Sequence, residues 1–151
     1  MKPIREKVAK ALITDAKDQM LILFRSGTHP RFAHHPDLPG GIVEDGEEPL
    51  AGLVREIREE LNVDVPPQKF AKIYQKSRET DYPHAKYITA DALYQVKIPE
   101  FHPDKIRLSW EHEKFQILPL RDFLRMDFPE NMDGYMRGVI EFLRERENSA
   151  K

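Results

Sequence analysis

Hydrophobic and polar positions divide the chain into segments with different periodicity. Two apolar-rich runs within residues 7–26, VAKALIT and MLILF, are separated by a polar stretch at 15–18, which predicts a β-hairpin. Residues 27–37 combine glycine, prolines and histidines without periodicity, which is typical of a loop. Later segments predict three more strands, at 69–77, 87–98 and 114–118, and a loop at 99–113.

One segment has a clear helical period. Its apolar residues recur at i, i+3, i+4, i+7 and i+11, the spacing of one buried face: Leu50, Leu53, Val54, Ile57 and Leu61. Pro49 suits the first helical position, where a missing N–H costs nothing. Asn62 follows the last apolar position and tolerates the left-handed conformation in which helices often end. The pattern therefore predicts a helix over residues 49–61.

A second helix is predicted near the C-terminus by Val139, Ile140, Phe142 and Leu143. The charged tail RERENSAK that follows is expected to fray. Strands, a central helix, further strands and a terminal helix together predict an α/β or α+β fold built from packed layers.

Composition and charge narrow the class of protein. With 151 residues, the chain is expected to form a single domain over 1–151. The 24 lysines and arginines nearly balance the 26 acids, so nothing global favours a nucleic-acid or membrane-surface partner. Cysteine is absent, which excludes disulfides and thiolate chemistry. No apolar run is long enough to span a bilayer and MKPIREKVAK lacks the apolar core of a signal peptide, so a cytoplasmic protein is expected.

Three glutamates share one ridge of the predicted helix beside its apolar face: Glu56, Glu59 and Glu60. Like charges at this spacing destabilise a helix by about a few tenths of a kcal/mol per pair. A hard divalent cation would offset the repulsion, because Mg²⁺ and Mn²⁺ prefer carboxylate and carbonyl oxygens. The alternative is a solvated charged face that Arg55 and Arg58 partly neutralise.

The glutamates belong to a longer string with fixed gaps: Gly41, five residues, Glu47, seven residues, then REIREE, one residue, Asn62 and Val63. This string resembles the signature of the Nudix hydrolase family, G-x5-E-x7-R-E-U-x-E-E-x-G-U, in which U is aliphatic. Every specified position matches except Asn62, where the family has glycine. The resemblance implies the Nudix fold, a mixed β-sheet sandwiched between α-helices, with the catalytic loop and helix at about 40–62.

Two departures from the family pattern stand out. Asparagine is the least disruptive replacement for a glycine in a left-handed cap, so we expect Asn62 to preserve the helix end and the activity. Many relatives have a tryptophan two residues before the leucine of the LPGG stretch, where this chain has Pro36. That difference bears on a contact to the substrate and leaves the metal site unaffected.

The resemblance implies particular roles for residues of the string. Glu56, Glu59 and Glu60 are expected to ligate Mg²⁺, or Mn²⁺ as a substitute, together with the main-chain carbonyl of Gly40. Glu47 is expected to pair with Arg55 and brace the loop against the helix. Nudix proteins typically cleave a nucleoside diphosphate linked to another moiety, by attack of water on phosphorus. The metal neutralises the diphosphate in such a reaction.

The general base is expected in the loop before the last strand. Glu111 lies in the sequence WEHE, and its E-H pair resembles one found at this point in many family members. Glu113 is a less favoured candidate, and Glu59 or Glu60 could act from the helix. The alternative for Glu111 is a surface acid in a charged loop.

Substrate contacts are expected upstream of the helix. Arg25 could reach a phosphate and Phe32 could line a base or sugar pocket, while the alternatives are a strand-end charge and a loop aromatic. His34 and His35 are a weak candidate pair for a transition metal. Tyr82 and Tyr87 could stack on a base, although tyrosines in strands more often pack in the sheet.

Several functions remain open within this class. The expected partner is a small nucleotide: a nucleotide sugar, an oxidised nucleoside triphosphate or a dinucleoside polyphosphate. A non-catalytic nucleotide-sensing Nudix domain is the alternative, but such domains usually lose acidic residues that this chain keeps. Isopentenyl diphosphate isomerase shares the fold but depends on a cysteine, which this chain lacks. Family members are often dimers, so a homodimer is compatible with the resemblance.

Overall fold

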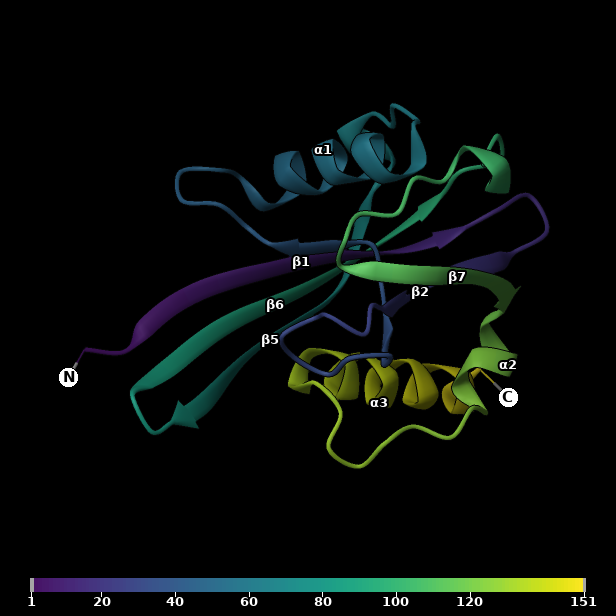
Figure 1. Ribbon diagram of the computed structural model, residues 1–151. Helices are drawn as coiled ribbons and strands as arrows, with labels where there is room; N and C mark the ends of the chain where they lie inside the picture. Colours follow the sequence, from purple (N-terminus) through teal and green to yellow (C-terminus); the bar gives the residue numbers. More distant parts are fainter. Residues whose placement is uncertain (1, 151) are drawn as a thin grey trace.

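The computed structural model describes residues 2–150 and is built around a mixed seven-stranded sheet (Figure 1). The strands are β1 Ile4–Thr14, β2 Gln19–Arg25, β3 Pro36–Asp37, β4 Gly40–Ile42, β5 Ala71–Tyr82, β6 Ala85–Lys97 and β7 His112–Pro119. The helices are α1 Pro49–Leu61, α2 Leu120–Leu124 and α3 Gly134–Ser149. Helix α1 covers one face of the sheet and α3 the other, which confirms the expected fold class.

Strand β1 is the centre of the sheet. It runs parallel to β6 along its whole length, from Ile4 opposite Tyr87 to Thr14 opposite Lys97. Strands β5 and β6 form a long antiparallel hairpin at one edge. The expected hairpin of β1 and β2 is confirmed only at its tip, where Thr14 pairs with Met20. Beyond that point β4 pairs with β1, and β3 and β7 pair with β2, so the sheet has two diverging arms.

Alternation along β1 gives the sheet two cores. Ala9, Ala11 and Ile13 point to the side of α1 and pack in one cluster with the helix's buried face, Leu53, Ile57 and Leu61. Val8 and Leu12 belong to the opposite cluster, which includes the buried residues of α3, among them Tyr135, Val139, Ile140 and Leu143. Burial of these apolar surfaces provides the main stabilisation of both layers.

The helix predicted over 49–61 is confirmed, and so is its left-handed end. Pro49 is the first residue of α1, and Asn62 has φ 57° and ψ 40°. The backbone N–H of Asn62 donates to the carbonyl of Arg58, which satisfies one of the free carbonyl groups of the last turn.

The expected fraying of the tail is wrong over the described residues, because α3 continues to Ser149; Lys151 lies outside them. Side chains of the tail are anchored: Arg144 Nε donates to the carbonyl of Leu124 at 3.0 Å. The short elements that were not predicted include α2 and β3, the latter inside the loop expected at 27–37. Within residues 2–150, none of the helices is long and apolar enough to cross a membrane.

Candidate active site

The loop that leads into α1 lies tightly against β1. Gly40 pairs with Lys10 and has φ +116°, a conformation that favours glycine. A Cβ atom at this position would overlap the backbone of Ala9 and Lys10. Glycine at position 40 therefore allows the loop to pass directly beside the central strand and fixes where α1 begins.

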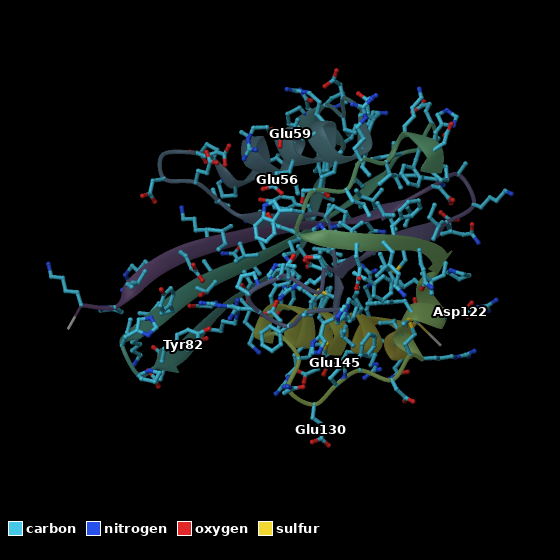
Figure 2. The ribbon with its side chains drawn as sticks, in the orientation of Figure 1. Glu56, Glu59, Tyr82, Asp122, Glu130 and Glu145 are labelled. Carbon is cyan, nitrogen blue, oxygen red and sulfur yellow. The ribbon has the colours of Figure 1, made fainter. Side chains whose placement is uncertain are left out.

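The three glutamates of the helix ridge line one pocket, together with Glu111 from the loop before β7. We call it the acidic pocket; its remaining lining residues are Glu44, Arg55, Arg107, Leu108 and Ser109. Figure 2 shows Glu56 and Glu59 on α1, with Glu56 nearer the sheet. The structure thus brings together four carboxylates that the sequence placed at two distant positions.

The carboxylates of Glu56 and Glu60 are partly buried, and burial is the largest influence on both. Burial raises the pKa of Glu56. It also raises the pKa of Glu60 to about 7, and the opposing, lowering influence of His112 on Glu60 is smaller. Glu60 Oε2 is buried without a hydrogen-bond partner among the described residues. Glu59 differs, because its side chain is 62% exposed and contacts Arg55. An unpartnered buried carboxylate oxygen is costly unless a ligand satisfies it.

The donor set of the acidic pocket fits a hard divalent cation. Carboxylate oxygens are the ligands that Mg²⁺ and Mn²⁺ prefer, and Glu60 Oε2 has an unused acceptor. Glu56 Oε1 lies beside Gly41, only 3.6 Å from where a Cβ of that glycine would stand. Among residues 2–150, no three histidine or acidic side chains converge closely enough in this arrangement to hold a metal ion.

Glu47 and Arg55 form the pair expected from the sequence. Arg55 Nε donates to Glu47 Oε2 at 3.1 Å and its NH2 group donates to Oε1 at 3.3 Å. The hydrogen bond from Arg55 is the main reason that the pKa of Glu47 is lowered. The Glu47 carboxylate also lies directly against Gly52, where any side chain would displace it. The pair holds the loop against the first two turns of α1.

Glu111 is carried by a loop that is docked on both neighbouring elements. The backbone N–H of Arg107 donates to the carbonyl of Glu60 at 2.7 Å, and Ser26 N–H donates to the carbonyl of Glu111 at 2.8 Å. The first bond attaches the loop to α1 and the second attaches it to the end of β2. His29 Nε2 lies 4.0 Å from Glu111 Oε2. The position of Glu111 is therefore fixed relative to the helix glutamates.

A buried charge cluster beside the site was missed at the sequence level. Asp37 is 3% exposed and accepts from Lys10, from Leu38 N–H at 2.8 Å, from Arg25 Nε at 3.4 Å and from His112 Nε2 at 3.0 Å. Burial alone would raise the pKa of Asp37, but Lys10, His112 and Arg25 outweigh it and hold the pKa well below its usual value. One signal was available: Lys10 interrupts the apolar run VAKALIT, and a buried lysine requires a partner.

The residues expected to contact substrate have different environments. Arg25 is buried: its NH2 group pairs with Asp133 at 3.0 Å and its NH1 group donates to the carbonyl of Arg31. Its donors are thus used inside the protein, and a phosphate contact stays a prediction. Phe32 lines a pocket with Tyr82 and Tyr87. His34 Nδ1 lies 2.5 Å from Glu113 Oε1, which ties Glu113 to the loop.

Comparisons with known proteins agree with this geometry. A family model described as the NUDIX domain matches residues 5–139. A bis(5'-nucleosyl)-tetraphosphatase [asymmetrical] from Caenorhabditis elegans is 27% identical over 110 residues, which cover 73% of this chain and 77% of that protein.

Solved structures share the fold. The crystal structure of a MutT protein from Methanosarcina mazei Go1 superposes with a TM-score of 0.69 at 24% identity, over 98% of both chains. The NUDIX domain of Shewanella oneidensis NrtR, solved with ADP ribose, gives 0.61 at 18% identity, over 97% of this chain and 89% of that one. Because the family model matches most of its length, the chain belongs to the NUDIX domain family and is an enzyme of the Nudix hydrolase kind.

Proposed function

We propose that this protein is a divalent-metal-dependent hydrolase that cleaves a phosphoanhydride bond in a nucleoside diphosphate linked to another moiety, with water attacking phosphorus. One observation carries the proposal: Glu56, Glu59 and Glu60 line a single pocket with Glu111, and Glu60 keeps a buried carboxylate oxygen without a partner. A folded protein retains such an arrangement at a cost to stability, which a bound cation offsets.

The glutamates of α1 and the main-chain carbonyl of Gly40 are the proposed metal ligands. Their oxygens suit Mg²⁺, with Mn²⁺ as a substitute. A bound ion would neutralise charge on the diphosphate and would make the attacking water easier to deprotonate. The chain itself contributes a rigid helix as the support, and the Glu47–Arg55 pair fixes the angle at which the loop with Gly40 meets that helix.

Glu111 is the proposed general base. Its role is to take the proton from the attacking water at a carboxylate oxygen. The backbone bonds of the loop to Glu60 and Ser26 hold the main chain of Glu111 beside α1, and its side chain lines the same pocket as the helix glutamates.

Relatives support a nucleotide as the substrate. The Caenorhabditis elegans relative is a bis(5'-nucleosyl)-tetraphosphatase and the Shewanella oneidensis domain was solved with ADP ribose. In both kinds of compound a phosphate chain joins a nucleoside to a second nucleoside or sugar. A dinucleoside polyphosphate and a nucleotide sugar are therefore the first compounds to test, followed by an oxidised nucleoside triphosphate.

The test is release of phosphate or nucleotide from these three classes, with Mg²⁺ and with Mn²⁺. We expect metal-dependent cleavage of one class by the wild type, and a loss of roughly 100-fold or more in Glu60→Gln. Glu145→Gln is the matched control, because Glu145 is an exposed glutamate on α3, across the sheet from the acidic pocket (Figure 2). Tight nucleotide binding without turnover across the panel would contradict the proposal and favour a sensing domain.

A further inference from the structure

His112 is the first residue of β7 and directly follows Glu111 in the chain. Its ring is buried and reaches Asp37 on β3, where His112 Nε2 lies 3.0 Å from Asp37 Oδ2. Strand β7 lies alongside β2, and β2 pairs with β3 as well (Figure 1). The His112 ring therefore links the two strands that flank β2.

The hydrogen bond between His112 and Asp37 has a fixed direction. Burial alone would raise the pKa of Asp37, but Lys10 and the other groups around the carboxylate hold it well below its usual value. The carboxylate is therefore ionised and can only accept, so Nε2 of His112 carries the hydrogen. A neutral tautomer and the charged ring both meet this requirement, and the ring is anchored in either state.

The ladder between β2 and β7 is irregular at the point where β7 begins. Its register shifts next to the pair of Arg25 and His112, so that Glu113 is an extra residue in β7. Such a bulge disrupts the ladder locally, and bulges often re-aim a side chain beside an active site. Backbone pairing alone therefore does not determine where Glu111 is held.

The residues around Glu111 offer little burial that could hold it. Trp110 is 66% exposed, and Glu111 and Glu113 are exposed as well. The nearest buried residues on either side of His112 are Ile98 and Phe123. His112 therefore gives this part of the chain a buried attachment, directly next to the carboxylate that lines the acidic pocket.

We propose that His112 is a positioning residue for the reaction: its hydrogen bond to Asp37 fixes the start of β7 and thereby holds the Glu111 carboxylate at the acidic pocket. The buried charge cluster then has a second role besides joining strands, because this ring connects it to the active site. The assignment rests on the proposed function, in which Glu111 acts as the general base.

The first experiment combines variants of His112 with Glu111→Gln and measures turnover of the cleaved substrate with Mg²⁺. His112→Phe keeps an aromatic ring but removes the donor, and we expect kcat to fall about tenfold or more while KM changes less than about twofold, because a displaced base impairs the chemical step. His112→Gln supplies an amide N–H in place of the ring N–H and should recover most of this loss. In the Glu111→Gln background, His112→Phe should cause no further loss.

His102→Phe is the matched control. His102 is an exposed histidine in the same connection between β6 and β7, so the same substitution there should leave kcat unchanged. Thermal melting checks that every variant is folded. A loss of turnover from His112→Phe that is equally large with and without Glu111 would overturn the assignment, because it would show a general effect on the fold.

Amide hydrogen exchange gives a second readout that needs no substrate. The Ser26 N–H donates to the carbonyl of Glu111, so its protection reports where the main chain of Glu111 lies. We expect exchange at Ser26 to become about tenfold faster or more in His112→Phe and to stay as in the wild type in His112→Gln.

Equal protection of Ser26 in the wild type and His112→Phe would also overturn the assignment. The two readouts separate this proposal from the proposed function. Faster exchange at Ser26 in a protein that cleaves none of the substrate panel would remove the hydrolase function and keep His112 as the residue that places Glu111. Cleavage with unchanged exchange and an additive loss of turnover would remove only the role of His112.

Discussion

Asp37 and Glu60 are two buried carboxylates of the same protein with opposite environments. Both oxygens of Asp37 accept hydrogen bonds from buried cations and a backbone N–H, and the pKa of the group is lowered. Glu60 has one oxygen without a partner, and burial raises its pKa to about 7. Buried cations neutralise Asp37, which joins neighbouring strands. One oxygen of Glu60 has no such partner, and in our proposal a cation from solution completes that site.

Removing the Asp37 carboxylate should produce the largest loss of stability. Asp37→Ala leaves the buried Lys10 ammonium without its carboxylate partner and removes one of the two carboxylates that Arg25 contacts, for which we expect a loss of about 3–5 kcal/mol in the free energy of unfolding. Urea unfolding measures this change. Glu60→Gln is the comparison and should be at least as stable as the wild type without metal, because it removes an unsatisfied buried charge.

The same comparison has a pH signature. Because the folded pKa of Asp37 lies below the unfolded value of 3.8, its contribution is complete above that value and is lost as pH falls through the folded pKa. Wild-type stability should therefore fall more steeply below about pH 4 than that of Asp37→Ala. Equal stability of the two proteins at neutral pH would contradict the structural role of Asp37.

Glu111→Gln should reduce turnover without changing the stability of the fold. We expect turnover to fall by well over tenfold, because the amide cannot accept the proton, while the unfolding midpoint stays the same. Glu113→Gln is the matched control, since Glu113 lies two residues away and contacts His34 outside the acidic pocket. Steady-state kinetics with the cleaved substrate measures the effect. Near-normal turnover in Glu111→Gln would remove this residue from the mechanism.

Glu47→Gln tests whether the brace between loop and helix supports the acidic pocket. The neutral amide weakens the double hydrogen bond to Arg55, and we expect divalent-ion affinity to fall by about 10-fold, as for other groups that orient ligands. Calorimetric titration measures the affinity. Glu48→Gln offers a neighbouring control at the start of α1, and an equal change in both variants would argue against a specific role for the pair.

Asn62 should give the smallest effect. Its φ of 57° is strained for a residue with a branched or apolar side chain, so Asn62→Ala should cost about 1 kcal/mol. Asn62→Gly should change the free energy of unfolding by only roughly a few tenths of a kcal/mol and should leave turnover unchanged. Thermal unfolding and kinetics together check both variants. A large gain in turnover for Asn62→Gly would show that the departure from the family pattern impairs the enzyme.

The sequence pattern correctly predicted elements whose boundaries are set by residues close together in the chain. Helix α1 begins at Pro49 and ends before Asn62 as expected, because the apolar spacing and both ends are encoded within one short segment. The clustering of Glu56, Glu59 and Glu60 follows from the same helical spacing, whereas the contact of Glu47 with Arg55 was implied by the resemblance to the Nudix signature. The roles of these residues in catalysis stay predictions.

Long-range pairing was beyond the reach of the same reasoning. The apolar runs around residues 7–26 indicated a hairpin, but they could not show that β1 would pair with β6 along its whole length. The side-chain partners of Asp37 come from three other strands, β1, β2 and β7, so only the folded chain reveals the cluster. The charged tail looked mobile because nothing in its sequence showed the anchoring of Arg144 to Leu124.

The most direct test of the central claim is calorimetric titration of MgCl₂, and separately MnCl₂, into the wild type, Glu60→Gln and Glu145→Gln. The claim is that the glutamates of the acidic pocket, among them Glu60 with its unpartnered carboxylate oxygen, form a divalent-cation site. We expect saturable binding by the wild type and by Glu145→Gln, and affinity at least about tenfold weaker in Glu60→Gln. Equal affinity in all three proteins, or binding by none of them, would contradict it.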